Sequence, residues 1–237
     1  MVALLASAIA VSCTGSGGAA RDSTSGTKPA ISEENPARTA AAVVPAASPN
    51  PTARRTLLFL GTSLTAGLGL DPDSAYPQRI QRKIDAAGLP YQVVNAGVSG
   101  ETSAGLLRRL DWVLKQPADV IVVETGANDG LRGLPITATS ATIGSVLDRI
   151  RRDRPTAALL LAQMEAPPNM GPDYTRAFHA MFPALAQEHG ATLLPFLLDN
   201  VAGRTNLNQS DGIHPNNAGE RIVTDNVWRA LQPVLAR

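Results

Sequence analysis

The sequence has few of the residues that build disulfides and metal sites. Its one cysteine, Cys13, excludes an intramolecular disulfide and a site with several cysteine ligands. Its three histidines form no HxH or HxxxH pair, so zinc chemistry has little to build on. The formal net charge is only +1, which gives no electrostatic reason to expect nucleic acid or another polyanion as a partner. We therefore expect a protein without a metal or another cofactor.

The first 13 residues form a short apolar segment with small side chains that ends at Cys13. This segment is too short to span a bilayer as a helix and is typical of a secretory signal with its cleavage site. A cysteine at that point also resembles a bacterial lipobox, in which the thiol is lipidated. We expect an exported protein, either a periplasmic or membrane-anchored lipoprotein attached through Cys13 or a secreted one. The alternative is an apolar terminus with a chance cysteine.

Residues 14–54 are rich in Gly, Ser, Ala, Thr and Pro and have no sustained apolar period. Such a composition cannot bury enough surface to offset the entropy of ordering it, so we expect a disordered tether. Residues 55–237 are then the folded domain, and nothing in the sequence indicates more than a monomer.

Strand and helix patterns alternate regularly through residues 55–237. Short apolar runs predict strands at 57–60, 92–95, 120–124, 158–162 and 192–195. Helical spacing predicts helices at 76–87, 103–115, 138–152, 173–189 and 216–235, on which Trp112, Trp228, Phe178 and Phe182 are expected to face the core. Uniformly apolar strands between helices predict an α/β fold: a three-layer α/β/α sandwich around a five-stranded parallel sheet.

Residues that can act together in nucleophilic catalysis follow these strands, and the ligand of such a fold lies beyond the strands' carboxyl ends. Ser63 follows the first strand, Gly97 the second and Asn128 the third, while Asp211 and His214 follow the fifth. A serine hydroxyl needs a base, for which His214 is suited, and a carboxylate three residues earlier can orient its imidazole. The N–H groups of Ser63 and Gly97 and the Asn128 amide are candidate donors to an oxyanion.

Each of these signals is weak by itself, because a serine after a strand is usually a helix cap and a lone glycine or asparagine usually shapes a turn. A non-catalytic, flavodoxin-like module that holds phosphate in the hydroxyl-rich loop 62–65 is a rival reading. It would not need Asp211 or His214. A degenerate hydrolase that only binds lipid or glycan is a further alternative.

The order of the pieces resembles the SGNH (GDSL-like) hydrolase family. That family carries Ser, Gly, Asn and Asp-x-x-His in successive blocks, and the resemblance extends from about residue 56 to the C-terminus. The sequence is most similar to the bacterial branch of acyl-CoA thioesterase I, lysophospholipase L1 and arylesterase. The runs GANDGLRG at 126–133, LLPF at 193–196 and DGIHPN at 211–216 carry this similarity. Thr62 stands where the family usually has Asp.

The resemblance implies the flavodoxin-like SGNH fold and a serine esterase that hydrolyses carboxylic esters or thioesters through an acyl-enzyme. By it, Ser63, Asp211 and His214 form the triad, and Ser63, Gly97 and Asn128 supply the oxyanion donors. The expected substrates are small molecules, namely short acyl or aryl esters or lysophospholipids, with carbohydrate acetyl esters as the alternative. The apolar residues after Asn128 are expected to line the acyl chain: Leu131, Leu134, Pro135 and Ile136.

Overall fold

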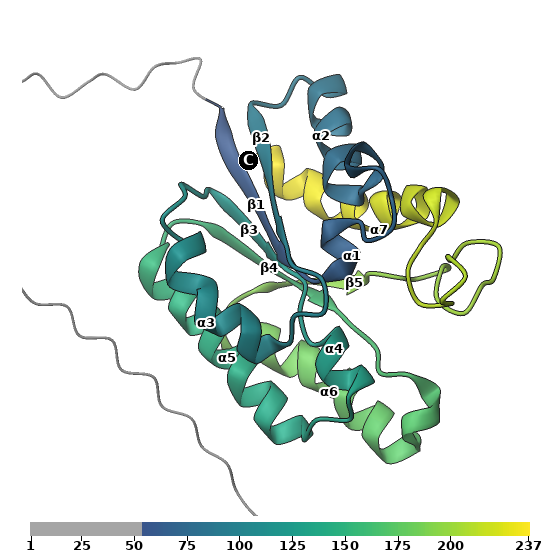
Figure 1. Cartoon of the computed structure of the whole chain (residues 1–237). Helices are drawn as coiled ribbons and strands as arrows, with labels where there is room; N and C mark the ends of the chain where they lie inside the picture. Colours follow the sequence, from purple (N-terminus) through teal and green to yellow (C-terminus); the bar gives the residue numbers. More distant parts are fainter. Residues whose placement is uncertain (1–53) are drawn as a thin grey trace, which may run out of the picture. The chain divides into compact units, whose positions relative to one another are not determined.

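The computed structural model describes residues 54–237, and these form a five-stranded sheet with helices on both faces (Figure 1). The sheet order is β2-β1-β3-β4-β5, and every neighbouring pair is parallel. This confirms the predicted fold class and the predicted number of strands. The strands are β1 (Arg55–Gly61), β2 (Tyr91–Gly97), β3 (Val120–Val123), β4 (Ala158–Gln163) and β5 (Thr192–Phe196).

Helices cover both faces of the sheet, as its apolar strands require. Figure 1 shows α2 and α7 on one face and α3, α5 and α6 on the other, with the short α1 and α4 at the ends of strands. The helices are α1 (Ser63–Ala66), α2 (Tyr76–Ala86), α3 (Ser103–Val113), α4 (Ala127–Leu131), α5 (Ile136–Asp153), α6 (Pro172–Glu188) and α7 (Asn217–Leu235), and two 3-10 turns are η1 (Pro72–Ser74) and η2 (Pro168–Met170).

The core lies between the sheet and the apolar stripes of these helices. On α3, Leu106, Leu110 and Val113 are buried at a spacing of three or four residues, which turns one face of the helix to the sheet. Trp112 falls between these positions and is 68% exposed. Its expected place in the core is therefore wrong, whereas Phe178 and Phe182 are fully buried.

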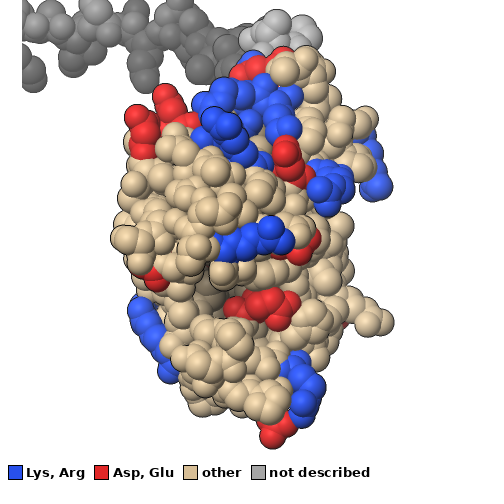
Figure 2. Space-filling view, turned by 90° about the vertical axis from the view of Figure 1, so that its right-hand side faces the viewer, with Lys and Arg blue, Asp and Glu red and all other residues tan. Residues whose placement is uncertain are grey.

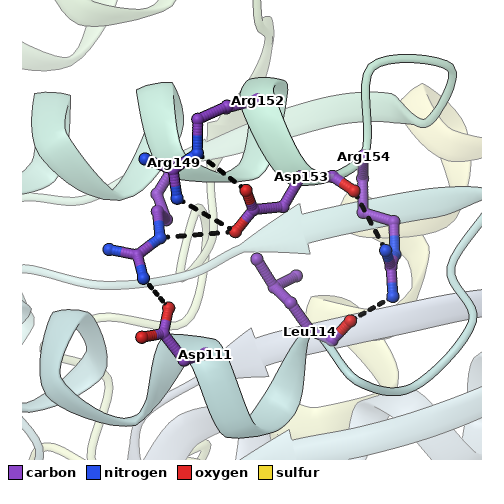
Figure 3. A network of polar contacts seen from close by, with 6 residues as sticks. All are labelled: Asp111, Leu114, Arg149, Arg152, Asp153 and Arg154. Carbon is purple, nitrogen blue, oxygen red and sulfur yellow. Dashed lines mark hydrogen bonds and ion pairs between the residues drawn. The ribbon is translucent and has the colours of Figure 1, made fainter.

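A network of ion pairs joins the outer sides of α3 and α5 (Figure 3). Arg149 on α5 pairs with Asp111 on α3 and with Asp153 one turn further along its own helix. Arg154 donates to the carbonyl oxygen of Leu114, just after α3. Because Asp111 is largely exposed, its pair with Arg149 is weakened by water and salt, and apolar packing supplies most of the contact energy.

The expected signal, the lipidation of Cys13 and most of the expected tether lie outside the described residues. Among the helices that are described, none is long and apolar enough to cross a membrane.

Candidate active site

Ser63 is the first residue of the short helix α1, which follows β1. Thr62 is the N-cap of α1, and its hydroxyl oxygen accepts a hydrogen bond from the N–H of Leu64 at 3.4 Å. A β-carbon at Gly61 would lie 1.9 Å from the hydroxyl oxygen of Thr65, so this tight turn requires glycine. The chain thus presents Ser63 as the first helical residue, with only 7% of it exposed.

Glu124 holds the turn that carries Ser63 in place through hydrogen bonds. This residue directly follows β3 and is fully buried, and Oε2 accepts from the N–H of Thr62 at 2.7 Å and from the hydroxyl of Thr65 at 2.9 Å. The Thr62 hydroxyl also donates to both carboxylate oxygens, at 3.0 Å each. Burial raises the pKa of Glu124, and the hydrogen bonds from Thr62 and Thr65 oppose that shift. Thr62, which departs from the family pattern, therefore caps α1 and is bonded to this carboxylate.

Asp211 and His214 lie in the loop between β5 and α7. The Oδ1 atom of Asp211 accepts from the N–H groups of Ile213 and His214, both at 3.0 Å. These two bonds, that of His214 first, lower the pKa of Asp211 to about 2, so it is ionised near neutral pH. Asn216 caps α7 through the N–H groups of Ala218 and Gly219, which fixes the end of the loop.

The structure brings Ser63, His214 and Asp211 into one line. The Nδ1–H of His214 donates to Oδ2 of Asp211 at 2.7 Å, because the ionised carboxylate can only accept. The other ring nitrogen, Nε2, then accepts from the Ser63 hydroxyl at 2.8 Å. The base thus lies within reach of the hydroxyl proton, and the carboxylate fixes the tautomer of the base.

Asn128 and Gly100 lie next to this line. Asn128 is in α4, and its Nδ2 donates one hydrogen to the carbonyl oxygen of Glu101 at 3.0 Å, which leaves the second amide hydrogen available. Arg132 donates to the carbonyl oxygen of Gly100 at 2.9 Å, so the loop after β2 is tied to α4. Within the described chain, the N–H groups of Ser63 and Gly100 have no protein acceptor.

The expected role of Gly97 is contradicted by its contacts. Its N–H already donates to Oδ1 of Asn95 at 2.9 Å, so it is not free for a substrate. Gly97 is instead the last residue of β2, paired with Gly61, and a β-carbon there would lie 2.4 Å from the backbone nitrogen of Ala66. The glycine is needed because β2 packs tightly against α1.

A cavity of about 510 Å³ opens beside the hydroxyl of Ser63. Viewed from the side on which the loop with His214 lies, the domain is hollowed near its middle, with acidic side chains at one border of the hollow and uncharged residues over most of the rest (Figure 2). Leu131 reaches the cavity as expected, but Leu134, Pro135 and Ile136 do not, and Ile136 packs against the core instead. The lining is mostly apolar and comes from several loops, with Leu64, Leu68, Met164, Ala166, Pro167, Pro168, Phe196, Leu198, Ala202 and Ile213 among its members.

Among the lining residues that sequence reasoning missed, Gly100 and Glu165 matter most for the chemistry of this cavity. Gly100 had a detectable signal, because it lies three residues past the end of β2, on a rim where Ser63 lies two residues past the end of β1. Glu165 had the same signal, since it lies two residues past the end of β4. Within residues 54–237, no group of three or more potential ligands can hold a metal ion.

Comparison with known proteins agrees with this geometry. The model of the GDSL-like Lipase/Acylhydrolase family matches residues 59–222. The esterase TesA of Pseudomonas aeruginosa is 40% identical over 185 residues, which cover 77% of this chain and 90% of that protein. The "Thioesterase 1/protease 1/lysophospholipase L1" of Escherichia coli K12 is 38% identical over 76% of this chain and 85% of its own length.

A solved structure gives the same result for the fold. The psychrotrophic esterase EstA of a Pseudoalteromonas species, solved in a form inhibited by monoethylphosphonate, superposes with a TM-score of 0.72 at 33% identity. The match covers 77% of this chain and all of that one. The chain therefore belongs to the GDSL-like lipase/acylhydrolase family.

Proposed function

We propose that this protein is a serine esterase that hydrolyses carboxylic esters or thioesters through an acyl-enzyme on Ser63. His214 takes the hydroxyl proton as Ser63 attacks the carbonyl carbon and then gives that proton to the leaving group. A water molecule, activated by the same imidazole, releases the acid and restores the serine. Asp211 holds the imidazole in the required tautomer and stabilises the imidazolium.

One observation carries this proposal: the continuous hydrogen-bonded line from Ser63 through His214 to Asp211. The link from Ser63 to His214 measures 2.8 Å and joins residues 151 positions apart, and the link from His214 to Asp211 measures 2.7 Å. A helix cap or a phosphate-binding loop would give Ser63 no reason to meet an imidazole that is itself oriented by a carboxylate. The line therefore favours a hydrolase over the flavodoxin-like binding module.

The oxyanion that forms during attack needs donors near Ser63. We assign this role to the N–H of Ser63, the N–H of Gly100 and the side-chain amide of Asn128. Gly100 replaces Gly97 in this set because its N–H has no protein acceptor in the described chain and it lines the cavity.

The cavity supports an acyl or aryl group as its occupant. Its volume of about 510 Å³ is within the usual range for small-molecule sites, and its mostly apolar lining suits hydrocarbon better than a sugar. Short acyl esters, aryl esters and lysophospholipids all fit this description. A carbohydrate acetylesterase would need more polar groups around the sugar.

The place of action is proposed from the sequence alone. The apolar segment that ends at Cys13 supports export, with lipidation of that cysteine as the anchor. Replacing Cys13 by Ser in the full-length protein should move it from the membrane fraction to the soluble fraction of the bacterium. Unchanged fractionation would reject the anchor without affecting the proposed chemistry.

The chemistry is tested by Ser63→Ala, with Ser99→Ala as its matched control on the same rim. The first change should abolish ester hydrolysis and covalent labelling by a fluorophosphonate, and the control should preserve both. Labelling that persists in Ser63→Ala would overturn the nucleophile assignment.

A second test separates catalysis from structure at Asn128. Because its amide would bind the oxyanion mainly in the transition state, Asn128→Ala should lower kcat by roughly 10²–10³, or about 2.7–4 kcal/mol, with little change in KM. The variant also loses the bond to Glu101, so its melting temperature is measured on the same preparation. A stable variant with normal turnover would defeat the oxyanion assignment.

A further inference from the structure

One acidic side chain lies in the wall of the mostly apolar cavity. Glu165 follows β4. It is the only carboxylate among the residues that line the cavity, and His214 is the only other titratable side chain there. Its side chain is 30% exposed, so it is shielded from bulk water over most of its surface. A charge in such a place interacts more strongly with a substrate than a charge on the open surface.

Two neighbours hold this carboxylate at one of its oxygen atoms. Oε1 lies 2.6 Å from Nδ1 of His179 and accepts from Nε2 of Gln163 at 3.3 Å. His179 is on α6, 61% exposed, and does not line the cavity. The other oxygen, Oε2, has no protein donor in the described part of the chain, so the carboxylate keeps free capacity to accept a hydrogen bond.

We propose, on the basis of the esterase function above, that Glu165 sets the acyl specificity of the cavity. It selects acyl chains that carry a hydrogen-bond donor, such as a hydroxyl group, and rejects chains that carry a carboxylate. The donor would be bound by the unused acceptor capacity of Glu165, while an acyl carboxylate would be repelled by like charge in a partly desolvated site. An unsubstituted alkyl chain would neither gain this hydrogen bond nor be repelled, so its kcat/KM should lie between those of the other two chains.

The experiment compares three p-nitrophenyl esters with acyl chains of equal length. The chains end in a methyl, a hydroxyl or a carboxylate group, and the leaving group is constant, so differences in kcat/KM report on the acyl site alone. The variants are Glu165→Gln, which keeps the shape and removes the charge, and Glu165→Arg, which reverses it. Glu188→Gln, at the exposed end of α6, removes the same charge outside the cavity.

We expect the native protein to prefer the hydroxylated over the carboxylated chain by at least tenfold in kcat/KM. Glu165→Gln should reduce this ratio about tenfold, Glu165→Arg should invert it, and Glu188→Gln should leave it unchanged. The rate at which fluorophosphonate labels Ser63 should stay the same in all four proteins, which shows that the catalytic groups are intact.

Two results would overturn the inference, and only the second would also overturn the proposed esterase function. Equal ratios in the native protein and in both Glu165 variants, with normal labelling, would remove Glu165 from specificity and leave the esterase function standing. A native protein that neither hydrolyses any ester nor reacts with fluorophosphonate would overturn the proposed function and this inference with it.

Discussion

Glu220 is a buried acid whose protonation should make the stability of this protein depend on pH. It lies in the first turn of α7 and is 1% exposed. Its Oε2 atom has no partner in the described structure. Burial raises the pKa of Glu220 from the ordinary value of 4.5 to about 8, and Arg79 only partly offsets this.

The direction and the size of the effect follow from that pKa. At pH values between 4.5 and about 8 the folded protein holds a proton at Glu220 that the unfolded chain releases. The free energy of unfolding therefore falls as the pH rises through this window, and the contribution of Glu220 is fully present only below pH 4.5. Relative to its value at low pH, the free energy of unfolding is lower by about 3 kcal/mol at pH 7, because each pH unit within the window corresponds to about 1.4 kcal/mol.

Glu220→Gln keeps the shape of the side chain and removes the titration. The difference in unfolding free energy between the variant and the native protein should increase in favour of the variant by about 2–3 kcal/mol from pH 5 to pH 7. Urea unfolding at several pH values measures it, and other titrating groups cancel in the difference. Glu188→Gln serves as the exposed control and should give a flat difference. A flat difference for Glu220→Gln as well would falsify this account of the buried acid.

Four further predictions concern the active site. Glu124→Ala leaves the buried donors of Thr62 without an acceptor, so unfolding titrations should show a loss of about 3–5 kcal/mol, and a loss below about 1 kcal/mol would contradict this. Gly97→Ala should lower the melting temperature through the clash with Ala66; an unchanged value would reject the tight packing. Asp211→Asn should lower kcat by about 10⁴ in steady-state assays, and a fall below tenfold would oppose its role. EDTA should leave the rate of hydrolysis unchanged; loss restored by a divalent ion would overturn the mechanism.

The sequence predicted the layers of the fold because its apolar periods are long and regular. All five predicted strands and five longer helices are present, with ends that differ by at most three residues. The short helices α1 and α4 were not predicted, since four or five residues are too few to show a helical period. The position of Ser63 could still be predicted, because a residue after a parallel strand reaches the rim whatever its local structure.

Details of the site that depend on strand register could not be predicted in this way. The sequence shows two glycines after the second apolar run, and only the pairing of Gly97 with Gly61 reveals that Gly97 still belongs to the strand. Gly100 lies past this point and borders the cavity. Glu165 lies two residues past the end of β4, so its place on the rim could be predicted, but only the folded structure shows that it lines the cavity.

The separation of Ser63 from His214 also has a consequence for when activity first arises. The two residues are 151 positions apart, and β1, which precedes Ser63, is an inner strand of the sheet between β2 and β3. During synthesis Ser63 emerges before the proposed base and before α7, so a nascent chain that stops short of His214 lacks the proposed triad. Ester hydrolysis should therefore begin only after the loop that carries His214 and α7 have packed against the rest of the domain.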